Sequence, residues 1–225
     1  MRFLHLTLAA CTLALPALAA ETRNVSGFTR VDLAAPLDLE VRPGKFSLTL
    51  ETDSDLTPYI RTDVEGDRLR ISLSGWHGNF RGKQRVKVTM PELRGVVIEG
   101  SGDVDIAGFN QQGMVELRIA GSGDVKYSGT SSGLSAAIEG SGDIVLADGQ
   151  AGSLQGSIRG SGNLKASGFK AKNVSISIDG SGDAEVRVAG GALSASVNGS
   201  GDIRWTGEAS TLSTATHGSG SIAKR

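Results

Sequence analysis

The triplet Gly-Ser-Gly recurs at a nearly constant interval, and this repeat limits the possible fold more than any other feature of the sequence. Its copies are separated by 21, 19, 20, 20, 19 and 19 residues and begin at Gly100, Gly121, Gly140, Gly160, Gly180, Gly199 and Gly218. A fixed period of this length is typical of solenoids, in which each repeat forms one coil and buries its apolar side only by stacking on its neighbours. We therefore expect one stacked array over this region.

Apolar residues alternate with small or polar residues on both sides of each triplet. In the third repeat, Leu134, Ala136 and Ile138 precede the triplet, and Ile144 and Leu146 follow it. This period of two predicts two short strands per repeat, each with one buried face. The chain is thus predicted to be all-β, with a right-handed parallel β-helix of about seven coils of 19–21 residues.

The two ends of the repeat array differ from its middle. In the last repeat, Leu212 is followed at the inward positions by Thr214 and Thr216, which predicts a polar end coil. Residues 21–95 lack the triplet but contain alternating segments. We expect a strand-rich N-terminal part there, followed by the solenoid over residues 96–225.

The first twenty residues have the features of a secretory signal peptide. Arg2 precedes an apolar run that ends in an AxA pattern, which predicts cleavage after Ala19 or Ala20. The single cysteine, Cys11, ends the lipobox-like sequence LAAC, so lipoprotein anchoring is the weaker alternative. We expect residues 1–20 to be removed and the mature chain to be exported, either to the periplasm or to the cell surface or extracellular space.

Charge and cysteine content argue against several kinds of partner and site. The sequence has 23 basic and 24 acidic residues, and loss of Arg2 with the signal peptide leaves 22 against 24, a net charge of -2. Nucleic-acid-binding proteins normally carry a basic excess, so no nucleic-acid partner is expected. Without Cys11, the mature chain can form neither a disulfide nor a cysteine-based metal site.

The residue after each triplet lies at an outward position and is usually an aspartate. It is Asn163 in the fourth repeat, Ser221 in the last, and otherwise Asp103, Asp124, Asp143, Asp183 and Asp202. Each could accept a hydrogen bond from a nearby backbone N–H and close a turn, a role that asparagine performs equally well. The alternative is a row of calcium ions between carboxylates of successive coils. We favour the turn because Asn163 interrupts the row, and we expect no other cofactor or metal.

The motifs of common enzymes are missing from the mature sequence. The triplet is not the GxSxG elbow, only His77 and His217 are available to activate a serine, and no zinc or dinucleotide motif occurs. Pectate-lyase-like enzymes also use parallel β-helices, with acidic and basic residues on one outer face. Scattered candidates for the basic group are Lys126, Arg159, Lys165, Arg187 and Arg204. The nearly uniform repeats favour a scaffold or a binding surface over a catalytic cleft.

One segment outside the repeats combines aromatic and basic residues. The sequence SGWHGNFRGKQRVKV contains Trp76, His77 and Phe80, followed at alternate positions of an expected strand by Arg81, Lys83, Arg85 and Lys87. Aromatic rings beside a basic row could bind an acidic polysaccharide or a phosphate-bearing surface. The alternative, which we favour, is a loop whose aromatic side chains cover the end of the first coil.

The segment MPELRGVVIEGSGDVDI and the GSGD or GSGN motifs that follow at a period near twenty residues carry a family resemblance. From about Val25 to its end, the chain resembles the putative auto-transporter adhesin, head GIN domain family. The resemblance implies an exported bacterial protein with a β-helix-like fold and brings no catalytic residues. Because the chain ends a few residues after the last motif, we expect no membrane barrel to follow, and therefore a periplasmic or peripherally attached protein.

Together these features predict a non-enzymatic, exported β-solenoid that binds an unidentified macromolecule or glycan of the cell envelope or surface. The alternative is a lyase-like or hydrolase-like β-helix enzyme that cleaves a polysaccharide. A cleft with converging aspartate and lysine or arginine side chains would favour the enzyme, whereas a smooth outer face would favour the binding protein. No transmembrane helix is expected in the mature chain.

Overall fold

The computed structural model describes residues 19–80 and 84–225. The elements before the repeats are β1 (Ala19–Arg23), β2 (Arg30–Ala34), β3 (Asp38–Pro43), β4 (Ser47–Thr52), the 3-10 helix η1 (Thr57–Tyr59), β5 (Ile60–Glu65), β6 (Arg68–Leu73) and β7 (Arg85–Met90). The repeat region contains β8 (Gly95–Gly100), β9 (Val104–Asn110), β10 (Met114–Gly121), β11 (Val125–Gly140), β12 (Ile144–Gly160), β13 (Leu164–Gly180), β14 (Ala184–Ala189), β15 (Ala192–Gly199), β16 (Asp202–Glu208), β17 (Thr211–Gly218) and β18 (Ser221–Lys224). Outside the described residues lie Arg81, Lys83 and the predicted signal peptide apart from Ala19 and Ala20. Nowhere in the described ranges is there a helix long and apolar enough to cross a membrane.

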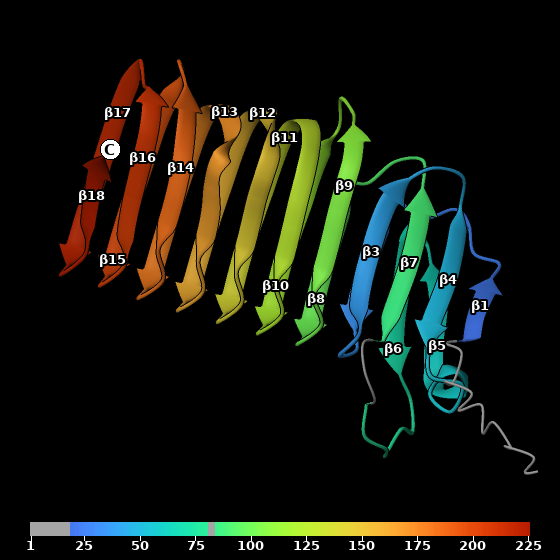
Figure 1. The fold of residues 1–225 in the computed structure, drawn as a ribbon. Coiled ribbons are helices and arrows are strands. Elements are labelled where there is room, and N and C mark those ends of the chain that lie inside the picture. The colour runs from blue at the N-terminus through green and yellow to red at the C-terminus, as the bar shows by residue number, and fades with distance from the viewer. Residues whose placement is uncertain (1–18, 81–83) are drawn as a thin grey trace, which may run out of the picture.

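The repeat region is a parallel β-solenoid, which confirms the predicted fold class (Figure 1). Successive coils pair in parallel, for example β8 with β10 and β9 with β11. The seven triplets delimit about six full turns, close to the predicted seven coils. We call the edge formed by the triplets the corner edge. The opposite edge, where each second strand leads into the next coil, is the far edge.

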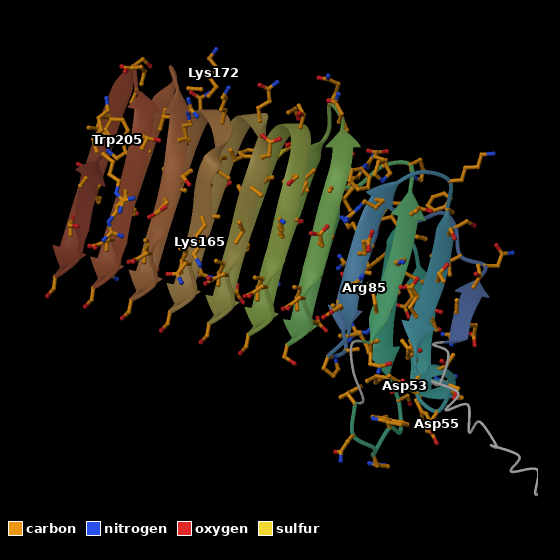
Figure 2. All side chains as sticks on the ribbon, in the orientation of Figure 1. Asp53, Asp55, Arg85, Lys165, Lys172 and Trp205 are labelled. Atoms are coloured by element: carbon orange, nitrogen blue, oxygen red, sulfur yellow. The ribbon has the colours of Figure 1, made fainter. Side chains whose placement is uncertain are left out.

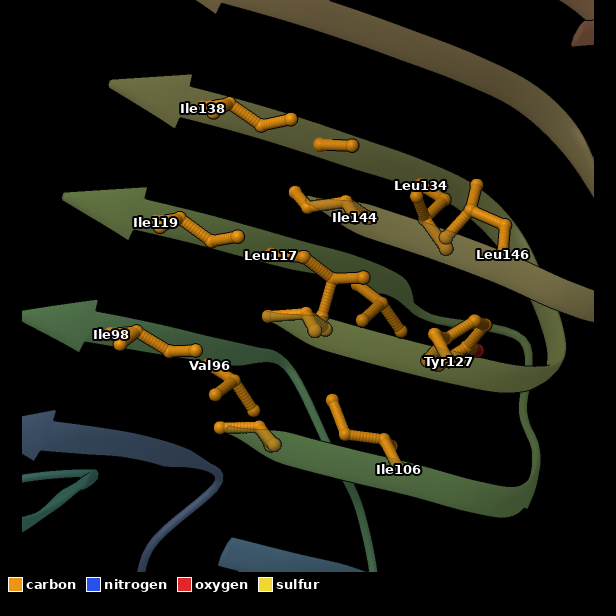
Figure 3. Close-up of a cluster of buried hydrophobic side chains, with 14 of the residues drawn as sticks. Val96, Ile98, Ile106, Leu117, Ile119, Tyr127, Leu134, Ile138, Ile144 and Leu146 are labelled. Carbon is orange, nitrogen blue, oxygen red and sulfur yellow. The ribbon is translucent and has the colours of Figure 1, made fainter. Parts of the chain in front are cut away.

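Equivalent residues of successive coils stack into columns that fill the space between the two strand layers (Figure 3). In one column, Ile98, Ile119 and Ile138 are register partners and are at most 1% exposed. The second strands supply facing columns, for example Val125 and Ile144. Full burial of such a side chain stabilises the fold by roughly 1.5–3 kcal/mol. A single coil cannot obtain this burial, because its neighbours provide the walls of each column.

Two glycines in each triplet are required by the backbone at the corner edge. The first has a φ that residues with side chains rarely adopt, for example +140° at Gly140. The second lies against the preceding coil, since a Cβ at Gly142 would be 2.0 Å from the carbonyl oxygen of Gly123. A side chain at the second position would push the two coils apart. This contact explains why the triplet returns with the period of the coil.

The N-terminal part extends the same stack, but its strands do not follow chain order. β2 pairs in parallel with β8, and β3 with β9, so the chain enters the stack beside the first triplet coil. β6 and β7 then pair in parallel with the other edges of β2 and β3. Outside them, β5 pairs with β6, β4 with β7 and β1 with β4, all antiparallel. We call β1, β4 and β5, which close this end of the molecule, the cap (Figure 1).

In the part of the chain that the structure describes, nothing covers the C-terminal end of the stack as the cap covers the other end. Among the described residues, β17 pairs with β15 and β18 with β16, and their outer edges have no strand beside them. Leu212 is 53% exposed, although its register partner Leu193 is 1% exposed. Thr214 and Thr216 occupy the next inward positions and are also exposed. The end coil therefore presents a mostly polar surface and two open strand edges to solvent.

Candidate binding surfaces

The residue after each triplet takes part in a hydrogen-bonded ladder along the corner edge. In each step, a side-chain oxygen accepts a bond from the backbone N–H of the equivalent residue in the next coil. The steps are Asp124 N to Asp103 Oδ1 (3.1 Å), Asp143 N to Asp124 Oδ1 (2.8 Å), Asn163 N to Asp143 Oδ1 (2.9 Å), Asp183 N to Asn163 Oδ1 (3.0 Å), Asp202 N to Asp183 Oδ1 (2.8 Å) and Ser221 N to Asp202 Oδ1 (3.0 Å). These side chains thus join neighbouring coils, and Asn163 continues the ladder without a break.

Further contacts stabilise two of the ladder carboxylates in their charged form. Burial works against the charge on Asp143, but hydrogen bonds from Lys165 and Asn163 outweigh it, so the pKa of Asp143 lies below its ordinary value. Lys165 donates to Asp143 Oδ2 at 2.6 Å. The hydroxyl and backbone N–H of Ser221 similarly lower the pKa of Asp202. Within residues 19–80 and 84–225, no group of three or more His, Cys, Asp or Glu side chains is placed to hold a metal ion.

The aromatic residues predicted as a binding site lie in an insertion at the corner edge. Residues 74–84 connect β6 to β7, where the coils of the repeat region need only a triplet. Trp76 packs partly buried against the core, and its ring centroid is 5.3 Å from that of Tyr59 and 6.4 Å from that of Phe80. Phe80 is 41% exposed, Tyr59 is 38% exposed, and His77 is exposed as well. The insertion therefore covers core beside the cap and leaves part of an aromatic cluster accessible.

The described members of the predicted basic row already have acidic partners. Arg85 and Lys87 lie at alternate, half-buried positions of β7. An Arg85 nitrogen is 3.9 Å from a Glu40 carboxylate oxygen, and Lys87 donates to Glu51 at 2.6 Å. These ion pairs join β7 to β3 on one side and to β4 on the other. The pairs neutralise this part of the strand, so it does not form a free basic face.

A shallow groove of about 530 Å³ crosses the outer face of β3, β7, β9, β11 and β12 near the corner edge. Its charged lining consists of Asp38, Glu40, Arg42, Arg85, Asp103, Asp105, Asp124 and Lys126. Arg42 donates to Asp105 at 2.5 Å and lies 3.4 Å from Glu40, which also faces Arg85 at 3.9 Å. The groove thus brings Arg85 together with Asp103 and Asp124, which are far from it in the sequence. Its two arginines are already paired with carboxylates.

The other basic candidates are spread over several coils. Ion pairs join Arg159 to Glu139, Lys165 to Asp143 and Arg204 to Asp202. Lys126 lines the groove, and Arg187 lies exposed on β14. His217 lies on the exposed strand β17. The structure therefore does not gather these residues into one site.

One corner of the stack lacks the triplet and was not recognised in the sequence. Residues 35–37 join β2 to β3, and the pairing of Leu39 with Val104 places Asp38 opposite Asp103. A Cβ on Gly102 would lie 2.2 Å from the Leu37 carbonyl oxygen, the same approach that later triplets make to each other. A sequence signal for this corner does exist. Residues 35–37 interrupt two segments of alternating apolar residues, and Asp38 follows this break as an aspartate follows most triplets.

Sequence comparison assigns the chain to a family. The family described as "putative auto-transporter adhesin, head GIN domain" matches residues 27–222. The chain belongs to this family. No curated protein matches the sequence significantly.

Solved structures of several bacterial proteins resemble this GIN-domain chain. A putative adhesin from Bacteroides fragilis has a TM-score of 0.83 at 25% identity, over 93% of this chain and 99% of its own. A putative adhesin from Parabacteroides merdae has a TM-score of 0.71 at 20% identity, over 92% and 95%. A putative lipid binding protein from Parabacteroides distasonis has a TM-score of 0.72 at 24% identity, over 92% and 96%. The last two likenesses show a common fold.

The GIN-domain match includes every surface described above. The ladder, the aromatic insertion and the groove all fall between residues 27 and 222, whereas β1 and Lys224 lie outside. The match therefore includes the strand-rich N-terminal part as well as the repeats, in agreement with the single stack that they build.

Proposed function

We propose that this GIN-domain protein is exported and acts without catalysis, as a scaffold that binds a macromolecule or glycan of the cell envelope. The ladder at the corner edge carries this proposal. It engages the repeated aspartates in bonds between coils, so these residues support the stack instead of forming separate reactive sites. The outer faces then present side chains at a fixed coil spacing of about 4.8 Å, which suits a repetitive partner.

The comparisons support a binding role for the family. The family description and the names of the B. fragilis and P. merdae proteins refer to adhesins, and the P. distasonis protein is named a lipid binding protein. These names describe the related proteins. Binding by this chain is our inference from its family and its surface.

Export is supported by the signal-peptide features of residues 1–20 and is compatible with the fold. Cleavage after Ala20 would leave Glu21 as the first residue, inside β1. Arg23 in the same strand donates to the backbone oxygens of Ile60 at 2.6 Å and Thr57 at 3.1 Å. These bonds would hold the new N-terminus in the cap.

We place a glycan contact at the accessible side of the aromatic cluster. Phe80 and Tyr59 expose ring surface, and Trp76 supports both from the core side. Aromatic rings offer a large, rigid contact area at a low cost in side-chain entropy. Trp76 and His77 belong to the same predicted site, but the buried part of Trp76 has a structural role in addition.

The proposal can be tested with the mature chain, residues 21–225, on a glycan array and on isolated envelope fractions, with turnover of the same glycans measured in parallel. We expect retention by at least one glycan or fraction without cleavage products. Phe80→Ala should weaken glycan binding about fivefold or more, because an exposed aromatic contact is lost. Val64→Ala is a matched control, since Val64 is an apolar residue with similar exposure (38%) but lies on β5. Retention by neither glycans nor envelope fractions would contradict the proposal.

The groove favours a second candidate function, cleavage of a polysaccharide. It places Lys126 beside Asp103 and Asp124, an arrangement that could supply a general base and a proton donor. The turnover arm of the same experiment tests this candidate. Cleavage products that appear with the mature chain and disappear with Lys126→Met would replace the binding function by the enzymatic one.

A further inference from the structure

Three cations gather at the far edge of the solenoid, on β13 and β14. Most basic side chains in the described ranges pair with a carboxylate. Lys170, Lys172 and Arg187 are exposed, and none of them belongs to the ion pairs of the described residues. We call these three residues the cationic edge.

The backbone fixes the members of the cationic edge beside one another. Phe169 and Ala171 are fully buried, so the alternation of β13 turns Lys170 and Lys172 to solvent. The β13–β14 register moves from Ala166 opposite Val186 directly to Lys170 opposite Arg187, so the three residues of β13 between them form a bulge with no partner on β14. Bulges of this kind redirect side chains and are common beside functional sites. Figure 2 shows Lys172 extending from the edge opposite the triplet corners.

A small hollow adjoins the two lysines. Its volume is about 260 Å³, and its lining is Thr130, Ser131, Gln150, Ala151, Gly152, Lys170, Lys172 and Ala189. This lining contains hydroxyl, amide and ammonium groups but neither a carboxylate nor a large apolar side chain. Glu208 on β16 is the register partner of Ala189. It lies 4.0 Å from Lys224 of β18, the strand on the side of β16 away from β14. The hollow therefore combines uncompensated positive charge with neutral hydrogen-bonding groups.

We propose that the cationic edge and the adjoining hollow form a binding site for an acidic polysaccharide. Lys170, Lys172 and Arg187 would pair with carboxylate, sulfate or phosphate groups of the chain, and Thr130 and Gln150 would bond its hydroxyls. Like charges on neighbouring rungs repel each other, and a polyanion removes that repulsion when it binds. A lipid surface fits less well, because no large apolar side chain of the hollow is available for insertion.

This proposal deepens the proposed envelope-binding function and rests on it. The test compares the mature wild-type chain with Lys170→Gln/Lys172→Gln/Arg187→Gln. The control triple variant, Lys45→Gln/Arg61→Gln/Arg94→Gln, removes the same charge from exposed positions elsewhere. Titrations use polygalacturonate, dextran sulfate, neutral dextran and phosphatidylglycerol vesicles at several salt concentrations. The envelope-fraction assay described above is run on all three proteins.

We expect the wild type to bind both polyanions more tightly than neutral dextran, with affinity that falls as salt rises. The cationic-edge variant should lose about tenfold or more in affinity, and the control variant about twofold or less. Equal losses in the two variants would overturn the site. Stronger binding to vesicles than to both polysaccharides would overturn the ligand class, and envelope binding with no polyanion binding would do the same. If the wild type bound neither an envelope fraction nor any glycan, the proposed function itself would be rejected.

Discussion

The two ends of the solenoid differ in how the apolar columns of the terminal coil are covered. Interior coils bury their apolar columns against both neighbours, whereas a terminal coil has only one neighbour. At the capped end, antiparallel strands bury Leu48, Leu50 and Ile60 to at most 1% exposure. At the open end, all of β17 is exposed, including Leu212 at an inward position. One end is thus covered by additional chain, and the other is left in contact with water.

The open end carries features that oppose pairing with another strand. Lys224 lies at an inward register position opposite Trp205, with its Nζ 5.0 Å from the ring centroid. Inward lysines and polar residues on edge strands are known means of preventing edge-to-edge association. The Lys224 ammonium also covers the Trp205 ring, which lies at this end of the core. The repeat sequence alone therefore builds the interior, whereas each end of the stack needs residues of its own.

The largest effect should come from forcing a side chain into a corner. A Cβ would lie 2.0 Å from the Gly123 oxygen in Gly142→Ala and 2.1 Å from the Gly201 oxygen in Gly220→Ala. We expect Gly142→Ala to lower the free energy of unfolding by about 3 kcal/mol or more, because coils on both sides must separate. Gly220→Ala should cost clearly less, since only the short terminal strand β18 must move. Urea denaturation measures both, and equal losses would contradict the difference between interior and open end.

At the capped end, Arg23→Ala should lower the free energy of unfolding by about 1–3 kcal/mol. The Arg23 guanidinium is the link between β1 and β5, with bonds to two backbone oxygens and to Thr62 Oγ1. Its loss leaves two carbonyls without this donor. Arg61→Ala is the control, because Arg61 is exposed on β5. A thermal melt in which both variants match the wild type would show that β1 contributes little to the cap.

In the interior, Asp143→Ala should lower the free energy of unfolding by about 1–2 kcal/mol, because the backbone N–H of Asn163 loses its acceptor. Asp143→Asn should cost much less, since asparagine already fills this role in the next coil. The pKa of Asp143 is lowered in the folded chain, so its charged form stabilises the fold above the ordinary aspartate pKa of about 3.9. This contribution is lost as pH falls below that value. Acid titrations of stability should therefore be flatter for Asp143→Asn than for the wild type, and parallel curves would refute the assignment.

The interior of the fold was predictable because its determinants are local and repeated. Triplet spacing and residue parity predicted parallel coils, since both the glycine corners and the alternating strands are visible in each repeat. The order of the N-terminal strands was not predictable in this way. β2 pairs with β6 and β8, neither of which follows it directly, and β7 lies between β3 and β4. Such choices depend on contacts between segments distant in sequence.

The candidate sites likewise depend on contacts between distant segments, which local sequence patterns do not predict. Alternation placed Arg85 and Lys87 on one face of a strand, but their partners Glu40 and Glu51 come from strands on either side of it. The aspartates were expected to bind a nearby backbone N–H, yet that N–H belongs to the next coil, which only stacking brings close. The cationic edge depends on a bulge that aligns Lys170 with Arg187, and no local pattern specifies it.

A smaller change in stability, but a change in assembly, is expected from Lys224→Ile. The substitution removes the inward charge beside two open strand edges and adds apolar surface next to Trp205. We expect the variant to associate through its open ends, and sedimentation velocity over a range of concentrations would detect this. Lys126→Ile, on an outer face away from the ends, should remain like the wild type. A monomeric Lys224→Ile chain would show that the polar threonines protect this end without help from the lysine.

The smallest effect should follow the removal of calcium. Carboxylates about 4.8 Å apart on neighbouring coils repel by only ~0.9 kcal/mol in water, a cost that backbone N–H donors can offset without a cation. In the ladder, one oxygen of each aspartate already accepts such a bond, and Asn163 occupies its position without a charge. We therefore expect thermal melts with added calcium and with chelator to have the same midpoint within about 1 °C, below the shift of about 2–4 °C that 1 kcal/mol gives in a chain of this length. A calcium-dependent rise in the melting midpoint that Asp143→Asn abolishes would instead place cations in the interior ladder. The stability of the interior would then depend on a ligand that neither end of the stack binds.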